Sequence, residues 1–126
     1  IWIEITTLFI PTQNDSIEEM REIAKFIASI DKNIPWHISA FHPSYKMTTL
    51  PNTSHQTLKT VYDIGKEAGL NYVYTGNIID EKRVNTYCPN CNNTVIKRTN
   101  SLGSEVINYL NNGNCSQCNT EIKGVW

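Results

Sequence analysis

Residues 1–30, IWIEITTLFIPTQNDSIEEMREIAKFIASI, contain the change of pattern that decides the fold. Apolar side chains alternate with a period of two over residues 1–10, which predicts a buried strand. The apolar residues then recur every three or four positions, which predicts a helix over residues 15–30. Asp15 and Glu18 have the spacing of a capping box at the start of that helix. A strand followed by an amphipathic helix is the first half of a βαβ unit.

The same alternation of elements continues along the chain. Residues 35–42, PWHISAFH, predict a second strand. Thr53 and Gln56 have the spacing of a second capping box, and Gly69 is suited to end the helix that follows. Residues 70–78, LNYVYTGNI, predict a third strand. Short loops and apolar strands favour a parallel βαβαβ arrangement with right-handed crossovers.

The composition changes after the third strand, where Gly, Asn and Cys dominate and long periodic helices disappear. TVIKR at 94–98 predicts a short strand, whereas SEVINYL at 104–110 fits either a strand or one helical turn. The boundary is placed near residues 80–86. We therefore expect a first domain over residues 1–82 and a small module over residues 83–126.

Four cysteines stand in two C-x-x-C pairs, Cys88 and Cys91 in YCPNC and Cys115 and Cys118 in NCSQC. Two such turns, each directing two sulfurs at one centre, form the closed tetrahedral site that is typical of structural zinc. The module has few large apolar groups, so we expect the metal to supply much of its stability. An iron–sulfur cluster on the same thiolates and disulfides in a secreted domain are the alternatives. A closed site has no open coordination position, which favours a structural role over a catalytic one.

The charges are nearly balanced, with 11 Lys and Arg, 12 Asp and Glu, and a formal net charge of -1 at pH 7. This balance gives no global electrostatic argument for nucleic-acid binding, and Lys97 and Arg98 are its only support beside the cysteines. No apolar run approaches the length of a membrane span, and the first residues lack the pattern of a signal peptide. We therefore expect a cytoplasmic protein that binds neither membranes nor nucleic acid.

Polar residues lie at the carboxyl ends of all three predicted strands, at residues 11–14, His42 and residues 75–77. Ligands of parallel α/β proteins bind at the carboxyl ends of the strands, so we expect a ligand site at this edge. Glu4 and Thr6 lie on the face of the first strand opposite its apolar face, which suits a partly polar cavity. The alternative is an edge strand with Glu4 in solvent.

Four segments together resemble the carboxyl-terminal half of a radical S-adenosylmethionine enzyme. They are EITTLFIPTQNDS at 4–16, PWHISAFHPSYKM at 35–47, NYVYTGNI at 71–78 and NTYCPNC at 85–91. The sequence is most similar to the branch related to pyruvate formate-lyase activating enzyme that is associated with Memo-type proteins, the AmmeMemoRadiSam group. The combination of IP-x-x-ND, FHP-x-Y and TYCP-x-C in this order carries the resemblance, which covers essentially the whole chain.

The resemblance implies a partial TIM-like barrel, of which this chain holds the last strands, followed by a cysteine-rich tail. It implies an oxidoreductase-type enzyme in which a [4Fe-4S] cluster cleaves S-adenosylmethionine to a 5'-deoxyadenosyl radical, which abstracts hydrogen from a substrate. A histidine that closes the corresponding strand in the activating enzyme contacts S-adenosylmethionine, which implies the same for His42. The resemblance also implies that Ser39, Glu4 and Thr6 face the reaction cavity as cofactor-binding residues.

The family's cluster motif, C-x3-C-x2-C, is not found in these residues. We therefore expect a carboxyl-terminal fragment, inactive alone, whose N-terminal half supplies the cluster. The open edge of the first strand predicts contact with that half or with a second copy in a dimer. A glycyl-radical or Memo-type protein is one substrate that the resemblance allows. The alternative function is a self-sufficient zinc-ribbon module that binds protein or nucleic acid.

Overall fold

The computed structural model describes residues 1–43, 50–99 and 105–125. The chain has a mixed α/β fold with two compact units, one over Glu4–Ile78 and the other over Ile79–Trp126 together with Ile1–Ile3. Residues 44–47, which contain the end of the segment PWHISAFHPSYKM, lie outside the described residues. Ser104, the first residue of SEVINYL, does so as well.

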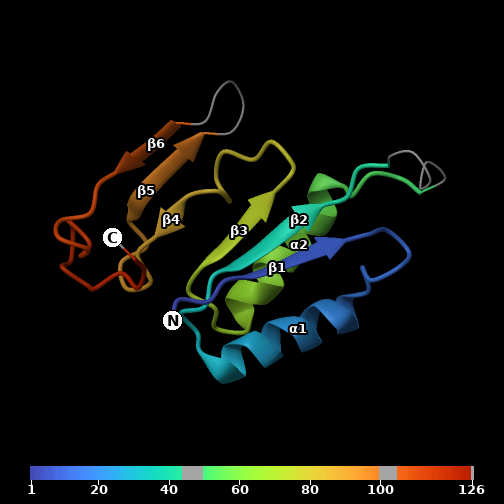
Figure 1. Ribbon diagram of the computed structural model, residues 1–126, viewed down its shortest axis with the longest axis horizontal. Helices are drawn as coiled ribbons and strands as arrows, with labels where there is room; N and C mark the ends of the chain where they lie inside the picture. Colours follow the sequence, from blue (N-terminus) through green and yellow to red (C-terminus); the bar gives the residue numbers. More distant parts are fainter. Residues whose placement is uncertain (44–49, 100–104, 126) are drawn as a thin grey trace. The chain divides into compact units, whose positions relative to one another are not determined.

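The unit over Glu4–Ile78 is built on a three-stranded parallel sheet with the strand order β1-β2-β3 (Figure 1). This confirms the predicted parallel βαβαβ order. The sheet is open at both edges among the described residues, and it is not a closed barrel. The elements are β1 (Ile5–Phe9), α1 (Ile17–Ile30), β2 (Trp36–Ala40), α2 (His55–Glu67) and β3 (Val73–Gly76).

Both helices pack on the same face of this sheet. The buried residues of each strand alternate with more exposed ones, and those of β2 are Trp36, Ile38 and Ala40. They form one core with the buried residues of α1 and α2. A Cβ added at Gly65 of α2 would lie 3.1 Å from Cε3 of Trp36, so glycine permits the close approach of helix and sheet. The core also includes Phe9, Met20, Ala24, Ile27, Leu58, Val61 and Val73.

The first strand is shorter than predicted, because β1 begins at Ile5 and the residues before it form no strand. The Ile5 N–H donates to the Pro35 carbonyl at 3.0 Å. Pro35 has no N–H, and β2 begins only at Trp36, so the ladder cannot continue toward the N-terminus. Ile1 and Ile3 are accordingly exposed rather than buried.

The helix caps also differ from the prediction, which placed them at Asp15 and Thr53. The caps are Ser16 and Ser54, whose hydroxyls accept the N–H of the third helical residue at 3.2 and 3.1 Å. Asp15 instead accepts the backbone N–H of Thr12, and the hydroxyl of Thr53 is buried between two strands. Both helices therefore start one residue later than the sequence pattern suggested.

The second unit contains a three-stranded antiparallel sheet with the order β4-β5-β6. The strands are β4 (Thr86–Tyr87), β5 (Thr94–Thr99) and β6 (Glu105–Asn108). Residues 105–108 are therefore a strand and not a helical turn, the two structures that the sequence of this segment allowed. The buried residues of this unit include Val84, Val95, Ile96 and Ile122 and two of the cysteines, Cys88 and Cys115.

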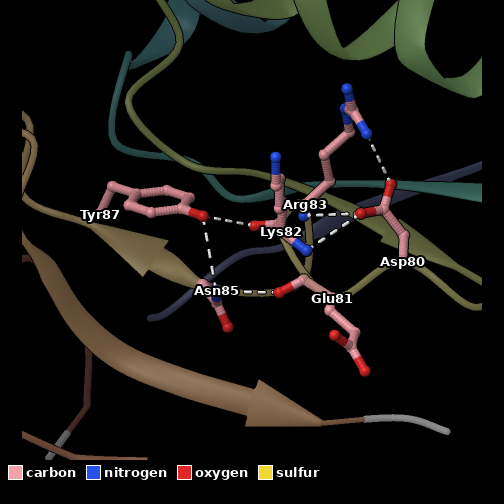
Figure 2. A network of polar contacts seen from close by, with 6 residues as sticks. All are labelled: Asp80, Glu81, Lys82, Arg83, Asn85 and Tyr87. Atoms are coloured by element: carbon pink, nitrogen blue, oxygen red, sulfur yellow. Dashed lines mark hydrogen bonds and ion pairs between the residues drawn. The ribbon is translucent and has the colours of Figure 1, made fainter.

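A network of polar contacts orders the chain just before β4 (Figure 2). The carboxylate of Asp80 accepts the backbone N–H of Lys82 and of Arg83 and pairs with the Arg83 guanidinium at 3.0 Å. The Tyr87 hydroxyl donates to the Lys82 carbonyl at 2.6 Å. Burial raises the pKa of Asp80, but the hydrogen bonds from Arg83 outweigh it and leave this pKa below its usual value.

Candidate functional site

The four cysteines come together at one point of the second unit. All four Sγ atoms lie within 4.8 Å of one another. The Sγ atoms of Cys88 and Cys118 lie 3.6 Å apart, and those of Cys91 and Cys115 are also 3.6 Å apart. Each close pair takes one sulfur from each C-x-x-C turn, so the cysteines are positioned to bind a metal ion between the two turns.

The backbones of the two turns repeat the same hydrogen bonds. Cys88 donates its N–H to the carbonyl of Asn93 and accepts the N–H of Asn92. The same two bonds, both at 2.8 Å, join Cys115 to the residues four and five positions after it. Asn92 and Asn119, which follow the second cysteine of each turn, both have positive φ, at 61° and 63°. Asparagine tolerates this left-handed conformation, so the sequence supports the turn geometry.

Polar neighbours surround the sulfur of Cys118, and sequence reasoning did not identify them. The Thr120 hydroxyl lies 3.1 Å from this sulfur, and the Asn90 side-chain amide lies 3.5 Å from it. The hydrogen bonds from Thr120 and Asn90 lower the pKa of Cys118 to about 5. A weak signal was present, because both residues lie within two positions of a cysteine in the sequence.

The thiol of Cys91 is shifted in the opposite direction. The backbone N–H of Asn93 lowers its pKa, but desolvation and hydrogen bonds with the three other thiols raise it to about 12. Without a metal, the cluster therefore keeps a proton on Cys91 that a bound cation must displace. Metal binding at this centre is expected to release protons.

Two sulfur separations at 3.6 Å, with all four sulfurs within 4.8 Å of one another, are compatible with one tetrahedral ion. A zinc–sulfur distance of about 2.3 Å places tetrahedral sulfurs about 3.8 Å apart, which is close to the observed 3.6 Å. All four cysteines are free, and separations of this size exceed a disulfide bond. A cluster would place the thiolates on several iron atoms and spread them further apart. The arrangement therefore favours a single ion over the two alternatives.

The carboxyl ends of the parallel strands are linked by polar contacts at the edge where the sequence predicts a ligand site. The buried hydroxyl of Thr53 donates to the Phe9 carbonyl at 2.6 Å and accepts the Phe41 N–H at 2.7 Å. The Nε2 atom of His42 lies 2.5 Å from the carbonyl oxygen of Asn77. This edge therefore joins the ends of β1, β2 and β3, with His42 exposed on it.

The sheet face opposite the helices carries the other predicted site residues. Thr6 stands beside His37 in the strand register, and Ser39 stands beside Gly76. The carboxylate of Glu4 pairs with Nε2 of His37 at 2.9 Å, with about half of the Glu4 side chain exposed. Glu4, Thr6 and Ser39 thus share one face, whereas His42 lies beyond the end of β2. His37 was not predicted as a site residue, although it alternates with the buried positions of its strand.

The basic residues beside the cysteines have different surroundings. The guanidinium of Arg98 donates to the Val84 carbonyl at 3.0 Å and to the Thr86 hydroxyl at 2.8 Å. Arg98 therefore has a structural role inside the module, while Lys97 is exposed. This reduces the support for nucleic-acid binding by the module.

Comparisons with known proteins find similarity to an archaeal protein. An uncharacterized protein of Methanocaldococcus jannaschii is 37% identical over 124 residues, which cover 97% of this chain and 37% of that protein. The chain thus spans little more than a third of the length of the curated relative that it matches. No protein-family model matches the chain, and no solved structure matches it. None of the helices in the described part of the chain has the length and hydrophobicity needed to cross a membrane.

Proposed function

We propose that this chain is the carboxyl-terminal portion of a radical S-adenosylmethionine enzyme and that its cysteine module holds a structural zinc ion. Two features support the proposal. Four segments resemble the family of pyruvate formate-lyase activating enzyme, and the order of the strands in the parallel sheet suits part of a barrel. The chain also matches only part of a much longer relative, as a portion of a larger enzyme would.

The observation that carries the proposal is the order of the parallel sheet. When each right-handed crossover moves to the next strand in the same direction along a sheet, every helix lies on the same face of that sheet. The strand order β1-β2-β3, with both helices in one core, follows this rule. A doubly wound sheet reverses direction and places helices on both faces. The winding seen here is the one that barrels use, so β1 to β3 are suited to be consecutive strands of a partial TIM-like barrel.

The side chains of the open face support the same proposal. Strands of a parallel sheet are normally apolar on both faces, because both faces are covered. Here the face away from the helices carries Glu4, Thr6, His37 and Ser39. In a partial barrel this face would line the cavity, where polar groups bind cofactor and substrate.

The cluster and S-adenosylmethionine would supply the radical chemistry, and the residues of this chain would bind and orient. His42 and the Asn77 backbone form one part of the edge, and we assign His42 to contact with S-adenosylmethionine. Ser39, Glu4 and Thr6 are assigned to the wall of the cavity. The four cysteines surround a single point and so would not serve as ligands of the radical-generating cluster.

The outer edge of β1 is proposed to pair with a preceding strand of the same polypeptide. The Asn14 side chain contacts the Leu8 carbonyl at 2.8 Å and the Ile10 N–H at 2.7 Å, which occupies the end of that edge. The backbone groups of Thr6 on this edge have no ladder partner among the described residues. We expect the amide hydrogen of Thr6 to exchange slowly in the longest gene product. In this chain alone we expect it to exchange fast. Fast exchange in both would contradict the pairing, and a dimer of this chain would show slow exchange in both.

The proposed activity is tested on the longest polypeptide that the gene encodes. The protein is reconstituted anaerobically with iron and sulfide, reduced with dithionite and given S-adenosylmethionine, and 5'-deoxyadenosine is measured. We expect a C-x3-C-x2-C segment upstream of Ile1 and formation of 5'-deoxyadenosine. A gene product without that segment, or without the nucleoside product, would contradict the proposal and favour the zinc-ribbon binding module.

His42→Ala in that protein tests the assignment at the sheet edge. We expect weaker binding of S-adenosylmethionine than in the wild type, because His42 lies at the edge where the ligand is proposed to bind. His55→Ala is the matched control, since His55 is exposed in the first turn of α2. Equal affinities in the two variants would remove His42 from the site.

A further inference from the structure

The side chains of Glu4, His37 and Tyr74 form a cluster on the open face of the parallel sheet. Glu4 directly precedes β1, His37 lies in β2 and Tyr74 lies in β3. The Nε2 atom of His37 lies 2.9 Å from Oε2 of Glu4. The ring of His37 stacks on the ring of Tyr74, with centroids 5.3 Å apart and an interplanar angle of 27°. The imidazole is therefore oriented from both sides, by the carboxylate and by the aromatic ring.

The Glu4 carboxylate determines which nitrogen of His37 carries the proton. An ionised carboxylate only accepts hydrogen bonds, so the neutral imidazole donates its Nε2–H to Glu4. The Nδ1 atom then has a lone pair and accepts hydrogen bonds. No described residue bonds to Nδ1 of His37, and this acceptor is available to a ligand.

The neighbours of His37 make space and indicate the chemistry of that ligand. Ser39 and Gly76 lie side by side in the next row toward the carboxyl ends of the strands. A Cβ added at Gly76 would meet no heavy atom closer than the Ser39 Oγ at 3.7 Å, so the glycine leaves room above the sheet. The described strand residues of this face include no lysine or arginine, so a phosphate or carboxylate finds no counter-charge on the sheet.

We infer that this face binds a ligand through an ammonium or amide N–H that donates to Nδ1 of His37, with Glu4 as the residue that positions the imidazole. The ligand lies over Ser39 and Gly76, where the side chains are small. The inference extends the proposed function, because it adds His37 to the cavity wall and states what kind of group that wall recognises. It concerns hydrogen bonding alone and needs neither the cluster nor the radical.

The test uses nuclear magnetic resonance on the zinc-loaded chain with ¹⁵N-labelled histidine at pH 8. The nitrogen shifts of His37 report which ring nitrogen carries the proton. Protonated ethanolamine is the probe, and sodium acetate at the same ionic strength is its anionic counterpart. We expect an Nε2–H tautomer, a shift of Nδ1 with ethanolamine, and no such shift with acetate.

Variants separate positioning from general charge effects. Glu4→Ala is expected to disturb the tautomer and to weaken ethanolamine binding by about tenfold. Glu22→Ala removes an exposed carboxylate on α1 and is expected to leave both unchanged. If Glu4→Ala changes the backbone amide spectrum, Glu4→Gln serves instead, because it preserves the size of the side chain. This variant should also weaken ethanolamine binding.

An Nδ1–H tautomer in the wild type would overturn the inference. Equal shifts with acetate, or unchanged ethanolamine binding in both Glu4 variants, would overturn it as well. None of these measurements involves S-adenosylmethionine or 5'-deoxyadenosine. Failure of the inference is therefore distinguishable from failure of the proposed radical activity.

Discussion

The Sγ atoms of Cys88 and Cys118 lie 3.6 Å apart although 30 positions separate them in the chain. The second close pair, Cys91 with Cys115, joins the same two turns in the same way. A single ion at this centre would therefore crosslink the turn after β4 to the turn after β6. The stability of the second unit is expected to depend on that crosslink, because its apolar core is small.

Removal of the metal is expected to unfold the second unit and to leave the sheet of β1 to β3 folded. Structural zinc sites contribute roughly 10 kcal/mol or more of folding free energy, which exceeds what a small core supplies. The measurement is elemental analysis for one metal ion per chain, followed by amide spectra before and after chelation. Cys118→Ser should reproduce the effect of chelation, and Ser116→Ala, a neighbour in the same turn, should not. A second unit that stays folded without metal would refute the structural role.

Metal affinity is expected to fall as the pH is lowered. In the metal-free cluster the pKa of Cys91 is raised to about 12, so its thiol is protonated at neutral pH and must lose a proton when metal binds. Each pH unit below neutrality should therefore weaken binding by at least about tenfold. Competition with a chromophoric chelator between pH 6 and pH 8 measures this dependence. An affinity independent of pH would mean that no thiol proton is displaced.

Thr120→Val is expected to weaken metal binding by about tenfold, the lower end of the effect of residues that support metal ligands. The variant removes the hydroxyl that lies 3.1 Å from the Cys118 sulfur. Thr120→Ser retains a hydroxyl and is expected to bind metal as the wild type does. The affinities are compared by chelator competition at one pH. If serine and valine give the same loss, the hydroxyl is not responsible.

Thr53→Val is expected to lower the free energy of unfolding of the first unit by about 2–3 kcal/mol. Thr53 is almost fully buried, and its hydroxyl bonds to the carbonyl of Phe9 and the N–H of Phe41. Valine would leave both backbone groups buried without a partner. Urea denaturation of the metal-loaded protein, followed by tryptophan fluorescence, measures the change. Thr53→Ser keeps the hydroxyl and should lower the free energy of unfolding by less than Thr53→Val does. An equal loss in the two variants would point to lost packing instead of lost hydrogen bonds.

The parallel sheet could be predicted from the sequence because its signals are local. The change from a period of two to a period near 3.6 distinguishes β1 from α1, and β2 and β3 are apolar segments bounded by turns. The ends of elements were less predictable. Asp15 and Ser16 are both good capping residues, and only the geometry of the turn selects Ser16.

The role of Thr53 depends on tertiary contacts alone. Its position before a helix predicts a cap, but its hydroxyl bonds to Phe9 at the end of β1, 44 positions away, and to Phe41 just after β2. The first strand is limited in the same way, since Pro35 of the neighbouring segment determines where its pairing starts. Neither effect leaves a periodic signal in the sequence.

The sequence by itself determined the βαβαβ order of the first unit and the four cysteines as candidate metal ligands, because hydrophobic period and C-x-x-C spacing act within a few residues. Only the tertiary structure decided that Glu4, His37 and Tyr74 meet on one face and that Thr120 and Asn90 support a cysteine. Those contacts depend on strand register and on how distant turns converge. Register and convergence are set by the packing of the whole unit, which no short stretch of sequence contains.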